Sequence, residues 1–119
     1  MTERRPIGAL EAQILEVLWK RRGAATPGDV LEALDGKLAY TTVMTVLTRL
    51  WQKGVVQRTK SGRAFAYEAK QTREEFFAER MMNTLASTSD HRAVLSRFIG
   101  GLSAKDTAAL RSILDAKKR

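Results

Sequence analysis

The sequence contains no cysteine among its 119 residues. Disulfide bonds, thiolate metal ligands and thiol chemistry are therefore excluded. The single histidine, His91, stands beside Asp90 and near no evident nucleophile. The chain also lacks a glycine-rich phosphate loop and the spacing of a metal-binding motif. We therefore expect no catalytic residues, no metal site, no cofactor and no enzyme activity.

The sequence also lacks a long hydrophobic run. No apolar segment approaches the roughly 18 residues that a membrane-spanning helix needs. The N-terminal residues MTERRPIGALE lack the apolar core of a secretory signal. We therefore expect no membrane insertion, and the absence of cysteine fits a cytoplasmic protein. Apolar residues still make up 44% of the chain, which suits one ordinary folded domain or two small ones.

Acidic residues are scarce in one region. Lys and Arg number 21 against 13 Asp and Glu, so the formal net charge is +8. Between Lys37 and Lys70 there are seven basic residues and one acid, Glu68. A charge this localised favours a polyanionic partner, such as nucleic acid or an anionic membrane surface.

Three helices are predicted before residue 54. Apolar spacing predicts the first from about Gly8 to Arg22. Thr26, Pro27 and Asp29 have the order of a helix cap, a first helical residue and a first-turn acid, and predict a short second helix. The third runs from about Thr41 to Lys53.

The third helix has an unusual exposed face. Its core positions follow the spacing i, i+3, i+4, i+7 and are Val43, Val46, Leu47 and Leu50. Its other positions include Thr42, Met44, Thr45, Thr48, Arg49, Gln52 and Lys53, with no acid. Threonine is a mediocre helix former, so helix stability does not explain these residues.

After Gly54 the period changes to that of strands. VVQRTK and RAFAYE, joined by a turn at Ser61-Gly62, predict a β-hairpin. Phe65 and Tyr67 are expected to face the core, and Trp19 and Trp51 to be packing residues rather than stacking platforms. Three helices followed by a hairpin predict a winged helix-turn-helix domain over residues 1–70. The fold class is therefore mainly α with a small β-hairpin.

Residues 71–119 are predicted to form a three-helix domain. Thr72 and Glu75 have capping-box spacing at its start. About 50 residues bury little surface alone, so we expect two copies of this domain to pair into a homodimer. The expected interface residues are Phe76, Phe77, Met81, Leu85, Leu95, Phe98, Leu110, Ile113 and Leu114.

The third helix and the hairpin together predict a double-stranded DNA interface. Threonine offers a hydroxyl to phosphates or base edges and a methyl group to thymine. The predicted contacts are Tyr40, Thr41, Thr42, Met44, Thr45, Thr48, Arg49, Lys53, Arg58, Lys60 and Arg63. Two alternatives stay open: a winged-helix module that binds protein, and a winged-helix regulator that senses a small molecule.

The segment AYTTVMTVLTRLWQKG, with LEAQILEVLW before it and VVQRTKSGRAFAYEA after it, resembles the BlaI/MecI/CopY family of bacterial transcriptional repressors. The resemblance covers nearly the whole chain and is closest to the BlaI/MecI branch. It implies a winged helix that binds a palindromic operator and C-terminal helices that pair two subunits. It also places Thr41, Thr42, Met44, Thr45 and Arg49 in the DNA-reading helix.

The resemblance implies a mode of induction as well. Because the chain has no cysteine, the cysteine metal site of the copper-responsive branch is excluded. The β-lactam-responsive branch controls antibiotic resistance and is inactivated by proteolysis, typically between Asn and Phe, through a membrane sensor-protease. Here Arg97 and Phe98 stand at that position, so the cleavage site departs from the family pattern. Phe98 also fits a core position of its own helix.

Overall fold

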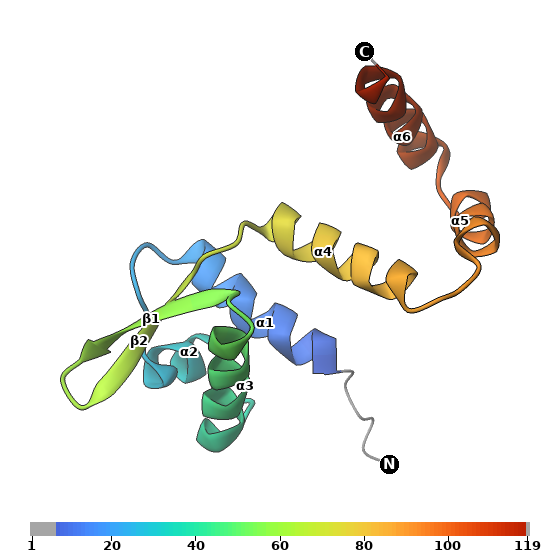
Figure 1. Ribbon diagram of the computed structural model, residues 1–119. Coiled ribbons are helices and arrows are strands. Elements are labelled where there is room, and N and C mark those ends of the chain that lie inside the picture. The colour runs from blue at the N-terminus through green and yellow to red at the C-terminus, as the bar shows by residue number, and fades with distance from the viewer. Residues whose placement is uncertain (1–6, 119) are drawn as a thin grey trace. The chain divides into compact units, whose positions relative to one another are not determined.

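A computed structural model describes residues 7–118 and has two compact units, which divide between Phe77 and Ala78. The first unit contains α1 (Ile7–Lys20), α2 (Pro27–Ala33), α3 (Tyr40–Gln52), β1 (Val56–Ser61), β2 (Ala64–Ala69) and the first residues of α4 (Arg73–Ala86). The second contains the rest of α4, α5 (His91–Gly100) and α6 (Ala104–Lys117). The fold is mainly α with one hairpin, as predicted (Figure 1). The N-terminal residues on which the signal-peptide expectation rests lie largely outside the described range.

The start of α2 confirms the predicted cap. The backbone N–H of Asp29 donates to Oγ1 of Thr26 at 3.1 Å, and the backbone N–H of Thr26 donates to Oδ2 of Asp29 at 3.0 Å. Pro27 follows as the first helical residue. These hydrogen bonds favour the ionised carboxylate, so the pKa of Asp29 lies below its ordinary value.

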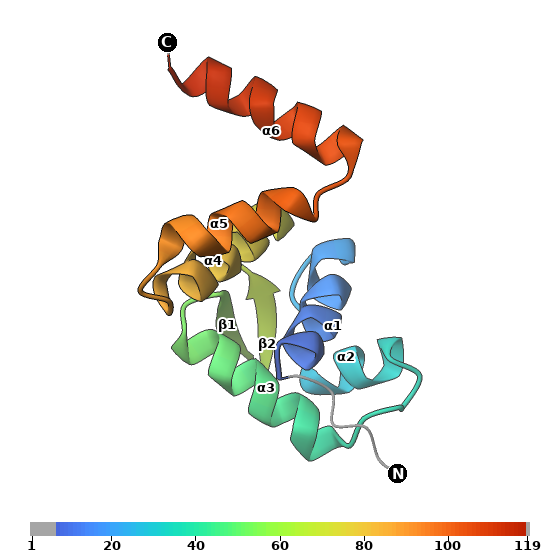
Figure 2. The same ribbon diagram turned by 90° about the vertical axis from the view of Figure 1, so that its right-hand side faces the viewer.

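The core of the first unit lies where α1, α2, α3 and the base of the hairpin meet. Helix α3 contacts α1, α2 and β1, as the turned view shows (Figure 2). The buried side chains include Ile14, Leu15, Leu18, Val30, Val43, Val46, Leu47, Leu50, Val56 and Tyr67. Because all four predicted core positions of α3 are buried, the opposite face of that helix is left to solvent.

The hairpin is antiparallel, with Val56 opposite Ala69 at its base and Ser61 opposite Ala64 at its tip. Gly62 has a φ of 63°, a conformation that favours glycine at this turn. Tyr67 is buried as expected, but Phe65 is 40% exposed, so the prediction that Phe65 faces the core is wrong. The helices cover only the base of the hairpin, and Phe65 lies nearer the tip.

The free edge of β2 is partly occupied by the loop between α1 and α2. The backbone N–H of Ala25 donates to the carbonyl of Tyr67 at 2.9 Å, and the N–H of Tyr67 donates to the carbonyl of Ala25 at 2.7 Å. This two-residue bridge fixes the hairpin to the helical part of the unit.

The first turn of α4 packs on α1. The Trp19 ring lies 5.8 Å from that of Phe76 and 6.1 Å from that of Phe77, and its Nε1–H donates to the carbonyl of Gln71 at 2.9 Å. Phe76 is only 4% exposed. The first unit therefore continues past residue 70, where the sequence placed a boundary, and Phe76 lies in its core rather than on a free surface.

An ion pair and a second cap hold the same turn. Arg73 binds both carboxylate oxygens of Glu16, at 2.7 and 2.9 Å, and this hydrogen bonding lowers the pKa of Glu16. Thr72 and Glu75 form the predicted capping box through two hydrogen bonds of 3.1 Å. The aromatic contacts, the ion pair and the cap together fix where α4 begins.

The second unit exposes most of its apolar side chains. Neither α5 nor α6 has a buried residue. Its exposed apolar residues include Met81, Met82, Val94, Leu95, Phe98, Ile99, Ile113 and Leu114. Within residues 7–118, no helix has the length and apolar character to cross a bilayer.

Candidate nucleic-acid interface

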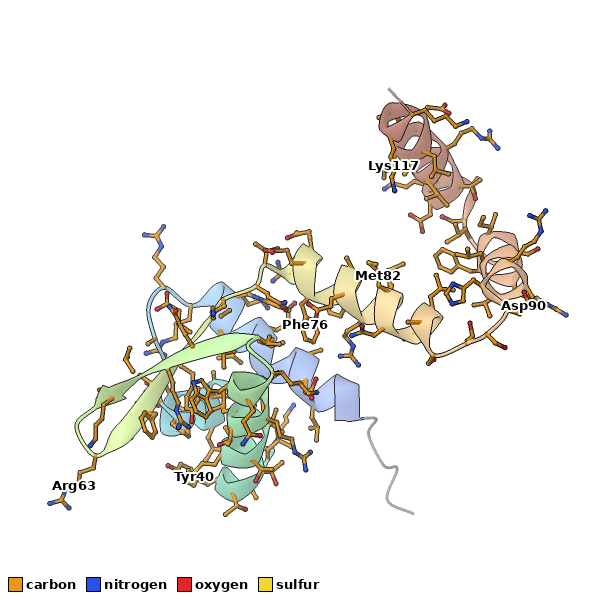
Figure 3. All side chains as sticks on the ribbon, in the orientation of Figure 1. Tyr40, Arg63, Phe76, Met82, Asp90 and Lys117 are labelled. Atoms are coloured by element: carbon orange, nitrogen blue, oxygen red, sulfur yellow. The ribbon has the colours of Figure 1, made fainter. Side chains whose placement is uncertain are left out.

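The exposed face of α3 carries the residues that the sequence assigned to DNA. Tyr40, Thr41, Met44, Thr45 and Arg49 are exposed, while Thr42 and Thr48 are half-buried. Figure 3 shows Tyr40 at the first residue of the helix, away from the core. The helix places these side chains on one surface because its core positions recur at helical spacing on the other.

Two threonines of this face bond to the helix itself. Oγ1 of Thr45 donates to the carbonyl of Thr41, and Oγ1 of Thr48 donates to the carbonyl of Met44, both at 2.8 Å. A hydroxyl has one proton, so neither group can at the same time donate to a phosphate. In this conformation each side chain offers a methyl group and an oxygen that accepts hydrogen bonds.

A shallow, open depression runs along the middle of the same face. It is lined by Met44, Thr45, Thr48, Arg49 and Gln52. Its lining combines apolar, hydroxyl, amide and cationic groups, the mixture that reads base edges and phosphates in DNA grooves.

The start of α3 suits a negatively charged group. Ala39 precedes the helix without a side-chain hydrogen bond to its first turn, and that turn holds no acid. Unpaired N–H groups at a helix N-terminus carry partial positive charge. A phosphate close to Tyr40 and Thr41 would meet no repelling carboxylate on α3.

Lys53, at the end of α3, was predicted to contact DNA but pairs with an acid of the protein itself. Lys53, which follows the helix, donates from Nζ to Oε1 of Glu11 at 2.9 Å. Glu11 is a buried acid of α1 and was not singled out from the sequence. Part of the Lys53 charge is therefore balanced within the protein, whereas Arg49 has an exposed side chain.

The hairpin presents two of its three predicted cations at its tip. Lys60 and Arg63 are exposed, and Arg63 points away from the helices (Figure 3). Arg58 is half-buried instead. Its guanidinium carbon lies 3.6 Å from the Trp51 ring centroid and 4.0 Å from the Phe65 ring centroid. The structure thus separates Arg58 from the two tip residues.

The described residues contain no cluster of three or more His, Cys, Asp or Glu side chains placed to hold a metal ion. His91 is the first residue of α5 and is exposed. Of the predicted interface residues in the second unit, Leu85 and Leu110 are half-buried and the others are exposed. Arg97 and Phe98 both lie within α5 with exposed side chains.

Known proteins resemble this chain over most of its length. Residues 7–116 match a family model described as penicillinase repressor. Two proteins from two strains of Mycobacterium tuberculosis, each named transcriptional regulator BlaI, are 38% identical over 113 residues, covering 91% of this chain and 82% of theirs. FabT of Streptococcus pneumoniae, solved in complex with DNA, aligns at 23% identity with a TM-score of 0.46, covering 92% of this chain and 71% of that one.

Proposed function

The chain belongs to the penicillinase repressor family, and from that premise we propose that it is a transcriptional repressor that binds a palindromic DNA operator as a homodimer. The names of the family and of its relatives describe regulators of transcription rather than enzymes.

One observation carries the proposal: the solvent face of α3 has no acid and lies beside a hairpin whose tip carries Lys60 and Arg63. Helix α3 and β1 are in contact, so the hairpin lies next to the helix within the first unit. A helix of this width fits the DNA major groove, and cations at a neighbouring tip reach the flanking backbone.

Each residue type on the surface has a distinct role in this reading. The methyl groups of Thr45 and Thr48 and the side chain of Met44 contact apolar atoms of the bases, such as the thymine methyl group. Arg49 lies near the phosphates as the helix leaves the groove. Lys60 and Arg63 neutralise phosphates beside the site, which adds affinity without reading sequence.

Pairing of two chains accounts for the exposed apolar residues of the second unit. Side chains such as Met81, Phe98 and Ile113 are 58%, 43% and 64% exposed in the single chain. Exposed apolar side chains in such number favour a protein interface. A two-fold dimer would present two copies of α3 to half-sites about one helical turn apart, which matches a palindrome.

Repression ends, in this proposal, by proteolysis between Arg97 and Phe98 through a membrane sensor-protease. The bond lies inside α5 (His91–Gly100), so a protease requires local opening of that helix. Cleavage would detach α6 and with it Leu110, Ile113 and Leu114 from the proposed interface. The controlled genes in this reading serve β-lactam resistance or a related stress response.

Footprinting of the purified protein on the DNA upstream of its own gene, across a salt series, tests the proposal. We expect protection of a palindrome, with affinity that falls steeply as salt rises. Salt-sensitive binding to every duplex, with no protected site upstream of the gene, would show that the protein has no specific operator in that region. Absence of binding to any duplex at low salt would contradict the proposal and favour a protein-interaction module. Release from the palindrome by a small molecule alone would favour a ligand-sensing regulator over proteolysis.

A further inference from the structure

The guanidinium of Arg58 lies over two aromatic rings that come from different elements. Trp51 is on α3 and Phe65 is on β2, and the guanidinium carbon is 3.6 Å and 4.0 Å from their centroids. Both aromatic side chains are 40% exposed, so neither belongs to the buried core. We call these three residues the Arg58 cluster.

The sheet register explains why the three side chains meet. Arg58 is directly opposite Tyr67, and Lys60 is directly opposite Phe65, so Arg58 and Phe65 are diagonal neighbours on one face of the hairpin. Nη1 of Arg58 also donates to the Tyr67 hydroxyl at 3.5 Å, a long hydrogen bond. That face of the hairpin is turned toward Trp51, since Arg58 on it lies 3.6 Å from the Trp51 ring centroid.

The chemistry of the Arg58 cluster suits a rigid contact between α3 and the hairpin. A guanidinium is planar and weakly hydrated, so it lies flat against aromatic rings where an ammonium would keep its water. Attraction between a cation and the face of Trp is the strongest of its kind. The cluster therefore links the last turn of α3 to both strands without using the core.

We propose that Arg58 is a positioning residue, which sets the hairpin against α3 so that Lys60 and Arg63 reach the DNA backbone while α3 occupies the groove. This inference rests on the proposed function and changes the role of one residue, because the sequence assigned Arg58 to DNA itself. Arg58 acts through the angle between the two elements, and the exposed tip cations make the phosphate contacts.

The geometry is tested without DNA. Ring currents of aromatic groups move the resonances of nuclei above their faces upfield, so the Nε–H proton signal of Arg58 should lie upfield of that of Arg63 in the NMR spectrum of the full chain. Trp51→Leu and Phe65→Leu should each move it back toward the Arg63 position. A signal of Arg58 that coincides with that of Arg63 in the unchanged protein would overturn the cluster.

The role is tested by binding to the palindromic duplex found by footprinting. Arg58→Lys keeps the charge but not the flat stacking group, so it should weaken binding roughly tenfold, about as much as Arg58→Met. Trp51→Leu, which removes no charge, should weaken binding similarly. Adding Trp51→Leu to Arg58→Lys should weaken binding little further, because either substitution alone already disrupts the Arg58 cluster. Lys60→Met should weaken duplex binding less in the Arg58→Lys protein than in the unchanged protein, because Lys60 is no longer held in position there.

Other outcomes separate the inference from the function on which it rests. Wild-type affinity in Arg58→Lys with weak binding in Arg58→Met would make Arg58 a phosphate contact and overturn the inference. The inference would also be overturned if the losses of affinity in the two single variants multiplied in the Arg58→Lys/Trp51→Leu double variant. Failure of the unchanged protein to bind any palindrome would instead remove the proposed function, while the NMR result on the cluster would stand. Amide spectra of each variant check that the fold is retained.

Discussion

Lys53, just beyond α3, donates a hydrogen bond of 2.9 Å from its Nζ atom to Oε1 of Glu11 on α1. Glu11 is 6% exposed, whereas the side chain of Lys53 is 58% exposed. The bond therefore ties the proposed DNA-reading helix to the helix that it packs against. It also pairs a buried carboxylate with a cation.

Substitution of Lys53 tests this tie. Lys53→Met should lower the free energy of unfolding by about 1–2 kcal/mol, because the carboxylate of Glu11 would keep its desolvation without its partner. Urea unfolding near neutral pH measures the change. Lys60→Met removes an equal charge from the exposed hairpin and should change stability by less than about 0.5 kcal/mol. Equal stabilities of the two variants would contradict the importance of the pair.

Arg49→Ala should weaken binding to operator and to unrelated duplex alike, because a phosphate contact carries no sequence information. The slope of the logarithm of the binding constant against the logarithm of salt concentration should become shallower by about 0.9. Fluorescence anisotropy across a salt series measures both. Arg22→Ala, an equal loss of charge outside α3 and the hairpin, serves as the control. An unchanged slope for Arg49→Ala would remove Arg49 from the phosphate contacts.

Thr45 should act through its methyl group, because its hydroxyl proton is donated to the carbonyl of Thr41. Thr45→Ser removes the methyl group and should weaken operator binding about fourfold, from roughly 0.8 kcal/mol for a buried methyl-sized group. Thr45→Val keeps that methyl group and should bind the operator better than Thr45→Ser. Neither change should alter binding to random duplex. The reverse order of the two variants would assign the contact to the hydroxyl.

Ile113→Glu should prevent formation of the proposed dimer. The side chain is 64% exposed in the single chain, so its loss leaves the chain's own core intact, while a carboxylate in an apolar interface is costly. Sedimentation velocity measures the state. Ser112→Glu places the same charge one position earlier on α6 and should leave the proposed dimer intact. A dimeric Ile113→Glu protein would place the interface elsewhere.

Asp29→Asn should flatten the loss of stability in acid. The pKa of Asp29 lies below its ordinary value because the backbone N–H of Thr26 bonds to its carboxylate. The stability that it contributes is present above that ordinary value and is lost as pH falls through the lowered folded value. Urea unfolding between about pH 5 and about pH 2 measures the slope. Glu32→Gln, on the same helix and exposed, is the control, and equal slopes in the wild type and Asp29→Asn would contradict the prediction.

Local signals predicted most of the first unit. Thr26, Pro27 and Asp29 act within one turn, so their order alone predicted the start of α2. The four apolar positions of α3 recur at helical spacing, so its buried face was also predictable. Contacts between distant residues were not. Glu11 and Lys53 are 42 residues apart, and no local pattern pairs them.

The error at Phe65 has the same origin. Alternation along a strand indicates which face a residue shares with Tyr67, but not how far the covering helices extend over the hairpin. Phe65 is covered by Arg58 and not by the core. The roles of the predicted DNA contacts, the dimer residues and the cleavage position stay predictions, because each depends on a partner molecule.

The contacts of Trp19 and Glu16 with residues at the start of α4 also determine when the first unit can finish folding during synthesis. Trp19 bonds to Gln71 and Glu16 bonds to Arg73, at sequence separations of 52 and 57 residues. A nascent chain that has emerged only to Lys70 holds β1, β2 and the first three helices, yet α1 still lacks these partners. Contacts this distant form late, and the unfinished surface around Trp19 is exposed until then. Folding of the first unit on the ribosome is therefore complete only when residues as far as Phe77 have emerged from the exit tunnel.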